Sequence, residues 1–153
     1  KRLEGLKIAY VGKGASNAAS LITGAIKCGM EVAVATPEKY GIKKNILDTA
    51  RQYGNITVTE NPIEAVRNAD VVYTDNYSYH SSISDKELEL LQPYQVNSSL
   101  MSYAAHNAQF MHSLPANRGI EVTPEIIDGK NSLVLEQGEN KLHTIKAALA
   151  LLI

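Results

Sequence analysis

The stretch from residue 110 to residue 119 holds the residue types best suited to chemistry. An apolar run ends at His112, and Ser113, Leu114, Pro115 and Arg118 follow it. A buried parallel strand delivers polar side chains to the carboxyl edge of its sheet in this way, and open α/β proteins bind ligands at that edge. A histidine there can donate to a carbonyl oxygen or transfer a proton. Taken alone, the pattern fits a hydrogen-bonded core histidine equally well.

Two more charged groups are expected near the same edge. Asp75 directly follows a β-favouring run at residues 70–74, so its carboxylate could accept a hydrogen bond from an amine. A turn or helix cap explains Asp75 equally well. Lys141 stands near the start of an apolar helix, where a lysine is ordinarily a solvated surface residue.

A glycine-rich turn, Gly12-Lys13-Gly14, joins the first predicted strand to the first predicted helix. Backbone amides and the positive end of a helix dipole would meet there, with Ser16 and Asn17 placed to contact a carboxylate. A nicotinamide dinucleotide would need a third glycine and an acidic residue after the second strand. The sequence has Asn17 and Thr36-Pro37 instead, so a nicotinamide-binding oxidoreductase is a weak alternative. Glycines that only shape a tight turn are the plainer interpretation.

Composition and charge exclude several classes of function. The 153 residues are 44% hydrophobic and 20% charged, which is typical of one folded domain rather than a disordered segment. With a net charge of −1 and no basic stripe, nucleic acid is not expected as a partner. No stretch approaches the roughly 20 apolar residues that span a membrane. The four histidines are scattered, so neither a metal nor another cofactor is expected. The single Cys28 cannot form an internal disulfide, and we interpret it as a small core residue of a cytoplasmic protein.

Short apolar strands alternate with helical segments along the chain. Strands are expected at residues 6–11, 31–35, 55–59, 70–74, 109–114 and 132–136, the third of them as an edge strand. Helices are expected at residues 16–27, 42–53, 61–66, 85–91, 98–105, 123–125 and 138–153, with a polar loop, mobile by composition, at 76–84. This alternation predicts an α/β fold: a three-layer, doubly wound, Rossmann-like parallel sheet with right-handed crossovers, in one domain over residues 1–153.

The last helix is too apolar to face water on all sides. We expect it to pack against a partner domain that this chain lacks, or, nearly as readily, to close the sheet of this domain. Lys1 stands just before a strand, and Ile153 ends an apolar helix without a polar cap. These abrupt ends suggest a domain cut from a longer chain.

Five segments, in the same order, resemble the second, amino-acid-binding domain of the ornithine carbamoyltransferase family. They are LKIAYVGKG near the start, VVYTD at 71–75, PYQVN at 93–97, FMHSLPANRGIEVT at 110–123 and ENKLH at 139–143. In that family a separate first domain binds carbamoyl phosphate through a Ser-Thr-Arg-Thr loop, which this sequence lacks, and the subunits form trimers with active sites between chains. The resemblance therefore implies a missing N-terminal domain and a homo-oligomer.

The implied reaction is attack of an uncharged amine on the carbonyl carbon of carbamoyl phosphate, with phosphate leaving. Such a site works mainly by positioning two substrates and stabilising an oxyanion. By resemblance, Asp75 and Ser113 would face the nucleophilic amine, which the backbone carbonyl of Leu114 would also orient. His112, helped by Lys141, would hydrogen-bond the carbamoyl oxygen.

Four positions around the expected acceptor depart from the family's pattern. The asparagine that holds the α-carboxylate of ornithine is Ser16 here, and Asn17 could replace it after a small shift. The Ser-Met pair that grips the amino acid head is Tyr79-His80. The signature cysteine is Ser113, which supplies no thiolate, and the family's arginine is Lys141, which lacks the planar fork for two oxygens. These changes argue for an altered acceptor or for weakened chemistry.

Ornithine is the default acceptor. Within the same class, the alternative is a transferase for putrescine or another amine, since putrescine carbamoyltransferases also lack the Ser-Met pair. Outside it, the alternative is a catalytically silent relative that binds an amino acid or a partner subunit.

Overall fold

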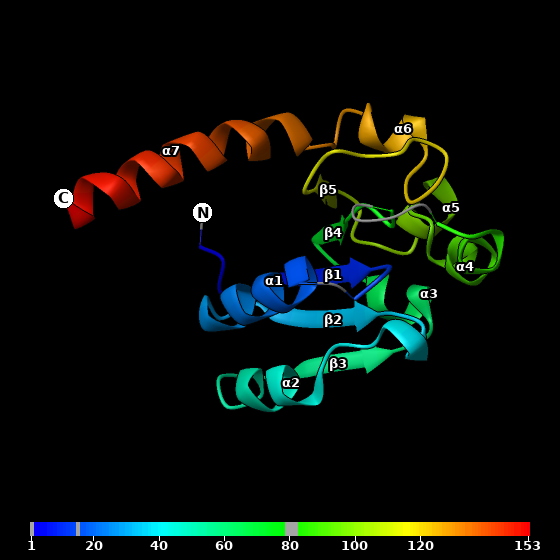
Figure 1. Ribbon diagram of the computed structural model, residues 1–153, viewed down its shortest axis with the longest axis horizontal. Helices are drawn as coiled ribbons and strands as arrows, with labels where there is room; N and C mark the ends of the chain where they lie inside the picture. Colours follow the sequence, from blue (N-terminus) through cyan, green and yellow to red (C-terminus); the bar gives the residue numbers. More distant parts are fainter. Residues whose placement is uncertain (1, 15, 79–82) are drawn as a thin grey trace.

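The computed structural model describes residues 2–14, 16–78 and 83–153. Five parallel strands form one sheet in the order β3-β2-β1-β4-β5 (Figure 1). The strands are β1 (Lys7–Val11), β2 (Glu31–Ala35), β3 (Ile56–Thr59), β4 (Val71–Thr74) and β5 (Gln109–His112). The doubly wound prediction is confirmed, with β3 at an edge as expected. Strand order reverses between β1 and β4, and ligands of such folds bind in the crevice at the carboxyl ends of the strands there.

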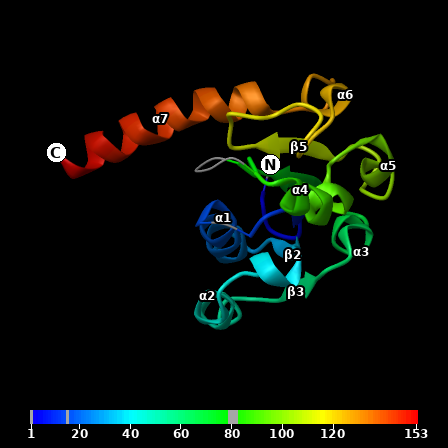
Figure 2. The same ribbon diagram turned by 45° about the vertical axis from the view of Figure 1, so that its right-hand side comes forward.

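Helices cover both faces of the sheet (Figures 1 and 2). Helices α1 (Ser16–Lys27) and α2 (Lys44–Ala50) pack on one face, and the 3₁₀ turn η1 (Glu38–Tyr40) precedes α2. The other face carries α3 (Pro62–Val66), the 3₁₀ turn η2 (Gln92–Tyr94), α5 (Ser98–Met101) and α6 (Pro124–Ile127). Helix α4 (Asp85–Leu91) lies beyond the carboxyl ends of the strands, and α7 (Val134–Leu152) runs back toward their amino ends (Figure 1).

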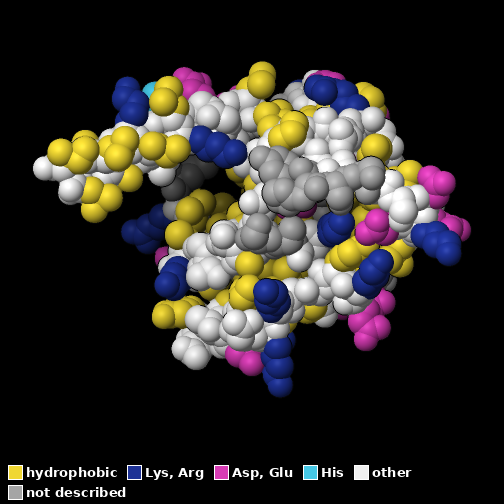
Figure 3. Space-filling view, in the orientation of Figure 1, with side chains coloured by type: hydrophobic (Ala, Val, Ile, Leu, Met, Phe, Trp, Pro, Cys, Tyr) yellow, Lys and Arg dark blue, Asp and Glu magenta, His cyan; other side chains and the backbone are white. Residues whose placement is uncertain are grey.

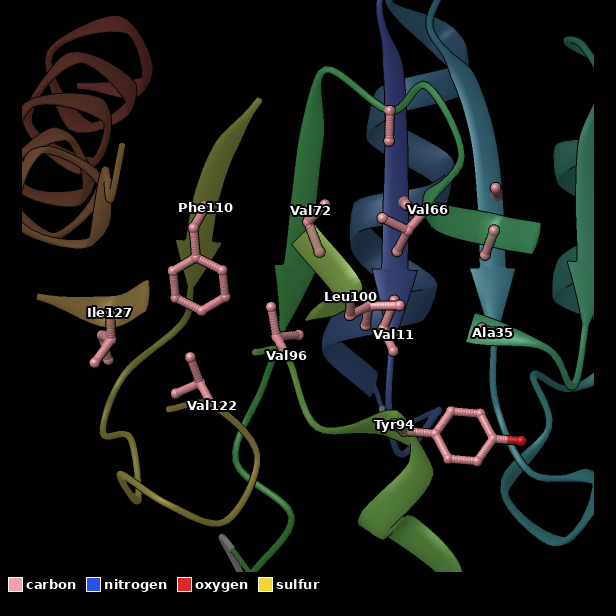
Figure 4. Close-up of a cluster of buried hydrophobic side chains, with 14 of the residues drawn as sticks. Val11, Ala35, Val66, Val72, Tyr94, Val96, Leu100, Phe110, Val122 and Ile127 are labelled. Atoms are coloured by element: carbon pink, nitrogen blue, oxygen red, sulfur yellow. The ribbon is translucent and has the colours of Figure 1, made fainter. Parts of the chain in front are cut away.

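The core consists of two apolar clusters, one on each face. Successive side chains of β1 point to opposite faces, as the pleat of a strand requires. Val11 therefore joins the cluster that holds Val72 and Phe110 (Figure 4), and Tyr10 joins the one that holds Ile22 of α1. This alternation buries Tyr10 on the α1 side, at the end of β1 where the crevice opens.

The predicted sixth strand at residues 132–136 is wrong. Ser132 makes a single isolated bridge to Phe110, and α7 begins two residues later at Val134. Periodicity cannot separate a strand from a helix in a five-residue apolar run. The first turn of α7 instead brings Gln137 to β5, where its Oε1 accepts from the backbone N–H of His112 at 3.2 Å. The helices predicted at 42–53 and 98–105 are present but end early, at Ala50 and Met101.

One further expectation about packing is wrong, and so is one of the two alternatives for the last helix. Cys28 is exposed rather than in the core, because it lies just beyond α1 and Gly29, with φ +75°, turns the chain there. Helix α7 does not close the sheet either, since Val134 alone is buried among its residues. Its outer half presents hydrophobic side chains (Figure 3), among them Ile145, Leu149 and Leu152. No helix in the described part of the chain has the length and apolarity to cross a bilayer.

Candidate functional site

Polar residues gather at the crevice between β1 and β4. The strand register sets Thr74 beside His112, so the residues that follow β4 and β5 leave the sheet together. Thr74 Oγ1 also donates to the backbone oxygen of Val11 at 2.7 Å, which ties the end of β4 to the end of β1. The structure therefore brings the glycine turn, Asp75 and His112 to one edge, as the order of strands and loops predicted.

Close packing dictates the glycines of the first turn. Gly12 has a φ of +132°, and a Cβ there would lie 2.7 Å from the Tyr77 ring. A Cβ at Gly14 would collide with the backbone oxygen of Tyr40. The structure describes neither Ala15 nor the side chain of Ser16, so the expected carboxylate contact of Ser16 is untested. Asn17, on the first turn of α1, places Nδ2 at 3.5 Å from Ser113 Oγ.

Asp75 is buried at this edge, only 3% exposed. Its Oδ1 lies 2.7 Å from the hydroxyl of Tyr10. Burial raises the pKa of the Asp75 carboxyl because the charged form loses water, and this outweighs the contacts with Tyr10, His112 and Asn17 that lower it. Asp75 therefore holds a proton more readily than a surface aspartate does.

His112 is fully buried behind this edge, and both of its ring nitrogens face protein groups. Its Nδ1 accepts from the backbone N–H of Leu114 at 2.8 Å, which leaves the ring hydrogen of a neutral imidazole on Nε2. Nε2 lies 3.5 Å from Oε1 of Glu121. The expected contact between His112 and a carbamoyl oxygen stays a prediction. Nε2 has no hydrogen-bond partner among the described residues.

The loop after β5 presents Ser113 and Leu114 to the crevice. Leu114 has a φ of +50°, a left-handed conformation uncommon for a branched side chain, and a cis peptide joins it to Pro115. The loop is held from two sides. Lys141 of α7 donates to the backbone oxygen of Ser113 at 3.1 Å, and Asn76 donates to that of Pro115 at 3.0 Å.

Glu121 is a site residue that our sequence reasoning missed. Its side chain is fully buried, and its Oε1 accepts from the backbone N–H of Asn117, which closes the loop that begins at Ser113. A single acid between Ile120 and Val122 was the available signal, since a carboxylate in an apolar run is seldom buried without a function.

Lys13 in the glycine turn belongs to a second cluster that the sequence did not reveal. Its ammonium lies 3.9 Å from Oε1 of Glu87 on α4, 4.8 Å from the centre of the Tyr40 ring and 3.3 Å from the backbone oxygen of Tyr77. A hydrogen bond from Tyr40, together with bonds from Ser84 at the start of α4, lowers the pKa of Glu87 to about 2. The charge of Lys13 is thus directed at α4 rather than at Asp75. Tyr79 and His80 lie outside the described residues.

The edge offers a definite set of chemical groups. Asp75 and the Leu114 carbonyl can accept hydrogen bonds from an amine, Ser113 can donate or accept, and Lys141 brings a positive charge. Within the described ranges, His, Cys, Asp and Glu side chains form no cluster of three that could hold a metal ion. A cavity of about 540 Å³ lies between α1 and residues Val71, Tyr73 and Met111 of β4 and β5, and Asn17 lines it at this edge.

An open α/β domain with this set of groups at its switch point is a small-molecule-binding domain of the doubly wound class. Residues 4–152 match the family described as "Aspartate/ornithine carbamoyltransferase, Asp/Orn binding domain". The chain belongs to this family.

Individual relatives agree with this assignment. The chain is 48% identical to an ornithine carbamoyltransferase of Caldicellulosiruptor saccharolyticus, over 97% of this chain and 50% of the relative. It is 41% identical to an ornithine carbamoyltransferase of Bacillus subtilis, over 97% of this chain and 49% of that relative. Among solved structures, ornithine carbamoyltransferase from Pyrococcus furiosus superposes with a TM-score of 0.92 at 39% identity, over 97% of this chain and 50% of that one. The chain thus spans about half the length of these relatives.

Proposed function

We propose that this chain is the acceptor-binding half of an ornithine-type carbamoyltransferase, which transfers a carbamoyl group from carbamoyl phosphate to ornithine. The observation that carries the proposal is the buried Asp75 at the β1–β4 crevice, on the same edge as Ser113 and the Leu114 carbonyl. A carboxylate and a carbonyl can hold the hydrogens of a neutral amine, so that its lone pair points toward an electrophile.

In the proposed reaction, the amine nitrogen attacks the carbonyl carbon of carbamoyl phosphate. A C–N bond forms, negative charge develops on the carbamoyl oxygen, and the C–O bond to phosphate then breaks. Asp75, whose pKa burial raises, is placed to hold the amine's hydrogens and to take up the proton released when phosphate leaves. Lys141, at the Ser113 carbonyl, contributes positive charge toward the oxyanion.

The other half of such an enzyme would bind carbamoyl phosphate. We propose that it packs on α7, whose exposed Ile145, Leu149 and Leu152 are otherwise left in water. A trimer with active sites between chains, and a reducing cytoplasm consistent with the lone Cys28, complete the proposal.

The test is carbamoylation by the full-length protein of ornithine, putrescine, lysine and related amines. We expect citrulline from ornithine, and Asp75→Asn should reduce its formation about 100-fold or more, because the amine loses its carboxylate partner. No transfer to any amine would overturn the proposal and favour a silent amino-acid-binding relative, which binding of labelled ornithine would then detect.

The acceptor depends on how Tyr79-His80 replaces the family's Ser-Met pair. An amino acid head left without partners would bind poorly, since a buried polar group without a partner costs about 1–3 kcal/mol, and a charged one more. We therefore expect weak use of ornithine relative to putrescine unless Asn17 and His80 hold the head. Specificity constants of both amines with the wild type and with Tyr79→Ser/His80→Met decide this. Strong ornithine preference that is lost in the double variant would show Tyr79-His80 to be a working substitute.

A further inference from the structure

Tyr10 connects the two sides of the crevice through its hydroxyl. Its ring is 1% exposed and stacks on Tyr73, with ring centres 6.3 Å apart. Its oxygen lies 2.7 Å from Oδ1 of Asp75, across the strand-order reversal, and 2.6 Å from the backbone oxygen of Lys13 in the glycine turn. Neither the sequence nor the family resemblance had assigned Tyr10 a role.

The two contacts of the Tyr10 hydroxyl depend on each other, because the protons on Tyr10 and Asp75 decide which of them can be hydrogen bonds. A tyrosine hydroxyl has one hydrogen, and a backbone carbonyl can only accept. If Asp75 is ionised, it too can only accept. The single hydrogen of Tyr10 then has two nearby acceptors, the Asp75 carboxylate and the Lys13 carbonyl, and can bond fully to only one of them. If Asp75 is protonated, it donates to the Tyr10 oxygen while Tyr10 donates to Lys13, and both contacts become hydrogen bonds.

We propose that Tyr10 is a positioning residue that couples the protonation of Asp75 to the glycine turn of the acceptor site. With Asp75 protonated, the Tyr10 hydroxyl donates its hydrogen to the Lys13 carbonyl. With Asp75 ionised, as binding of an amine requires, the hydroxyl turns to the carboxylate and supports its charge. The inference rests on the proposed function, which gives Asp75 the amine.

Other groups around Asp75 also affect its pKa, so a test variant has to leave them in place. They approach from β4, the loop after it, α1, β5 and the loop after β5: Tyr73, Tyr77, Asn17, His112 and Glu121. Glu121 raises the pKa of Asp75, whereas Asn17 and His112 lower it. Tyr10→Phe leaves all of them in place and removes one buried oxygen.

Activity of the full-length protein gives the first measurement. The quantity to compare is the ratio of kcat/KM for Tyr10→Phe to kcat/KM for the wild type. Ionisation of the free amine affects both values equally and therefore drops out of this ratio. We expect this ratio to be about 0.1 or less, since a hydrogen bond to a charged group is lost, and to fall further as pH decreases. In Tyr10→Phe the ionised carboxylate of Asp75 has lost its hydrogen-bond donor, so the pKa of Asp75 is higher than in the wild type. As pH decreases, Asp75 therefore becomes protonated earlier in the variant than in the wild type, and the ratio falls. Tyr94→Phe, which removes a hydroxyl that donates to the backbone oxygen of Glu60, is the control and should give a pH-independent ratio.

Thermal unfolding of four proteins gives a second measurement that needs no catalysis. They are the wild type, Tyr10→Phe, Asp75→Asn and the double variant. With Asp75 present, the loss of melting temperature caused by Tyr10→Phe should grow as pH rises through the titration of Asp75. In the Asp75→Asn background, where the new amide can donate to Tyr10 at every pH, that loss should be constant. A loss with the same pH dependence in both backgrounds, with a flat activity ratio, would overturn the role of Tyr10 while leaving the transferase proposal intact. Absence of transfer by the wild type would refute the transferase, and the unfolding data would still decide the coupling.

Discussion

At the scale of single residues, the site is built from buried polar groups that bond to one another or to backbone amides of the nearby loop. Asp75 contacts Tyr10, His112 holds the Leu114 amide and faces Glu121, and Glu121 holds the Asn117 amide. Each of these groups would be costly to bury alone. The bonds from Tyr10 to Asp75, from the Leu114 amide to His112 and from the Asn117 amide to Glu121 hold this edge in one arrangement, as the proposed reaction by positioning would require.

The two ring nitrogens of His112 can be tested separately. We predict that His112→Ala in the full-length protein lowers kcat about 100-fold or more, by removing either an oxyanion donor or the acceptor that positions Leu114. His112→Asn retains a polar atom near Nδ1, whereas His112→Gln retains one near Nε2. If the ring acts through Leu114, Asn should restore more activity than Gln. The reverse order would support direct contact with the carbamoyl oxygen, and unchanged kcat in all three would refute both roles.

Asp75 should reduce stability at neutral pH. Its folded-state pKa lies above its unfolded value, so the folded state binds the proton more tightly and unfolding becomes easier as pH rises from below the unfolded pKa through the folded pKa. We predict that Asp75→Asn raises the melting temperature at pH 7 by roughly 2–4 °C and removes this part of its pH dependence. Calorimetry across the pH range in which the Asp75 carboxyl titrates measures both. A lower melting temperature at pH 7 would contradict the sign.

At the scale of elements, the carboxyl ends of β1, β4 and β5 set the site, and the turns after them are shaped by close contact. In the turn after β1, position 12 requires glycine for two reasons: its φ is positive, and the Tyr77 ring leaves no room for a side chain. A short helix, α3, is held by Asn61, whose side chain accepts from two backbone amides at its start. Helix α7 delivers Lys141 to the loop after β5.

A pair of glycine substitutions tests the shape of this turn. Gly12→Ala should destabilise the protein by roughly 2 kcal/mol or more, because of strained backbone and overpacking against Tyr77. Gly24→Ala, inside α1 with no atom within 4 Å of the added carbon, should stabilise it by about 0.5–1 kcal/mol. Chemical denaturation of both variants beside the wild type supplies the two free energies of unfolding. Equal effects at the two positions would disprove the close approach at Gly12.

At the scale of the whole molecule, α7 stands apart from the compact sheet and its helices (Figures 1 and 3). Its outer turns contact little of the domain, and Leu149 and Leu152 are 53% and 84% exposed. Exposed apolar surface of this kind often marks an interaction site. In the proposed enzyme that partner is the carbamoyl-phosphate-binding half.

The exposed leucines of α7 should therefore make the isolated 153-residue chain associate. We predict that Leu149→Lys/Leu152→Lys lowers its apparent mass in sedimentation experiments toward the monomer, whereas Lys146→Gln on the same helix has no such effect. In the full-length protein the same double variant should lower the melting temperature, because two charges would be buried at the contact between the halves. An unchanged melting temperature there would place the partner of α7 elsewhere.

The sequence by itself determined the class of fold and the edge at which the polar groups gather. Runs such as residues 8–11 and 71–73 are apolar throughout, as strands covered on both faces must be, and residue 75 directly follows its strand. Since parallel strands end at a common edge, position along the chain was enough to bring Asp75, His112 and the glycine turn together. The same local reasoning failed at 132–136, where a short apolar run fits a strand and a helix equally.

Only the tertiary structure decided which polar groups meet. Tyr10 and Asp75 are 65 positions apart, and Lys13 reaches Glu87 through a turn and a helix that no local pattern relates. In the sequence Glu121 stands out only as an acid between two apolar residues, and it is the fold that removes it from water and sets it opposite His112. Whether a side chain is core or surface also depends on what packs over it, which is why Cys28 was misplaced and why the sequence left two alternatives open for α7. Hydrophobic periodicity is a property of neighbours in sequence, whereas hydrogen-bond partners and burial are set by contacts between segments distant in the chain.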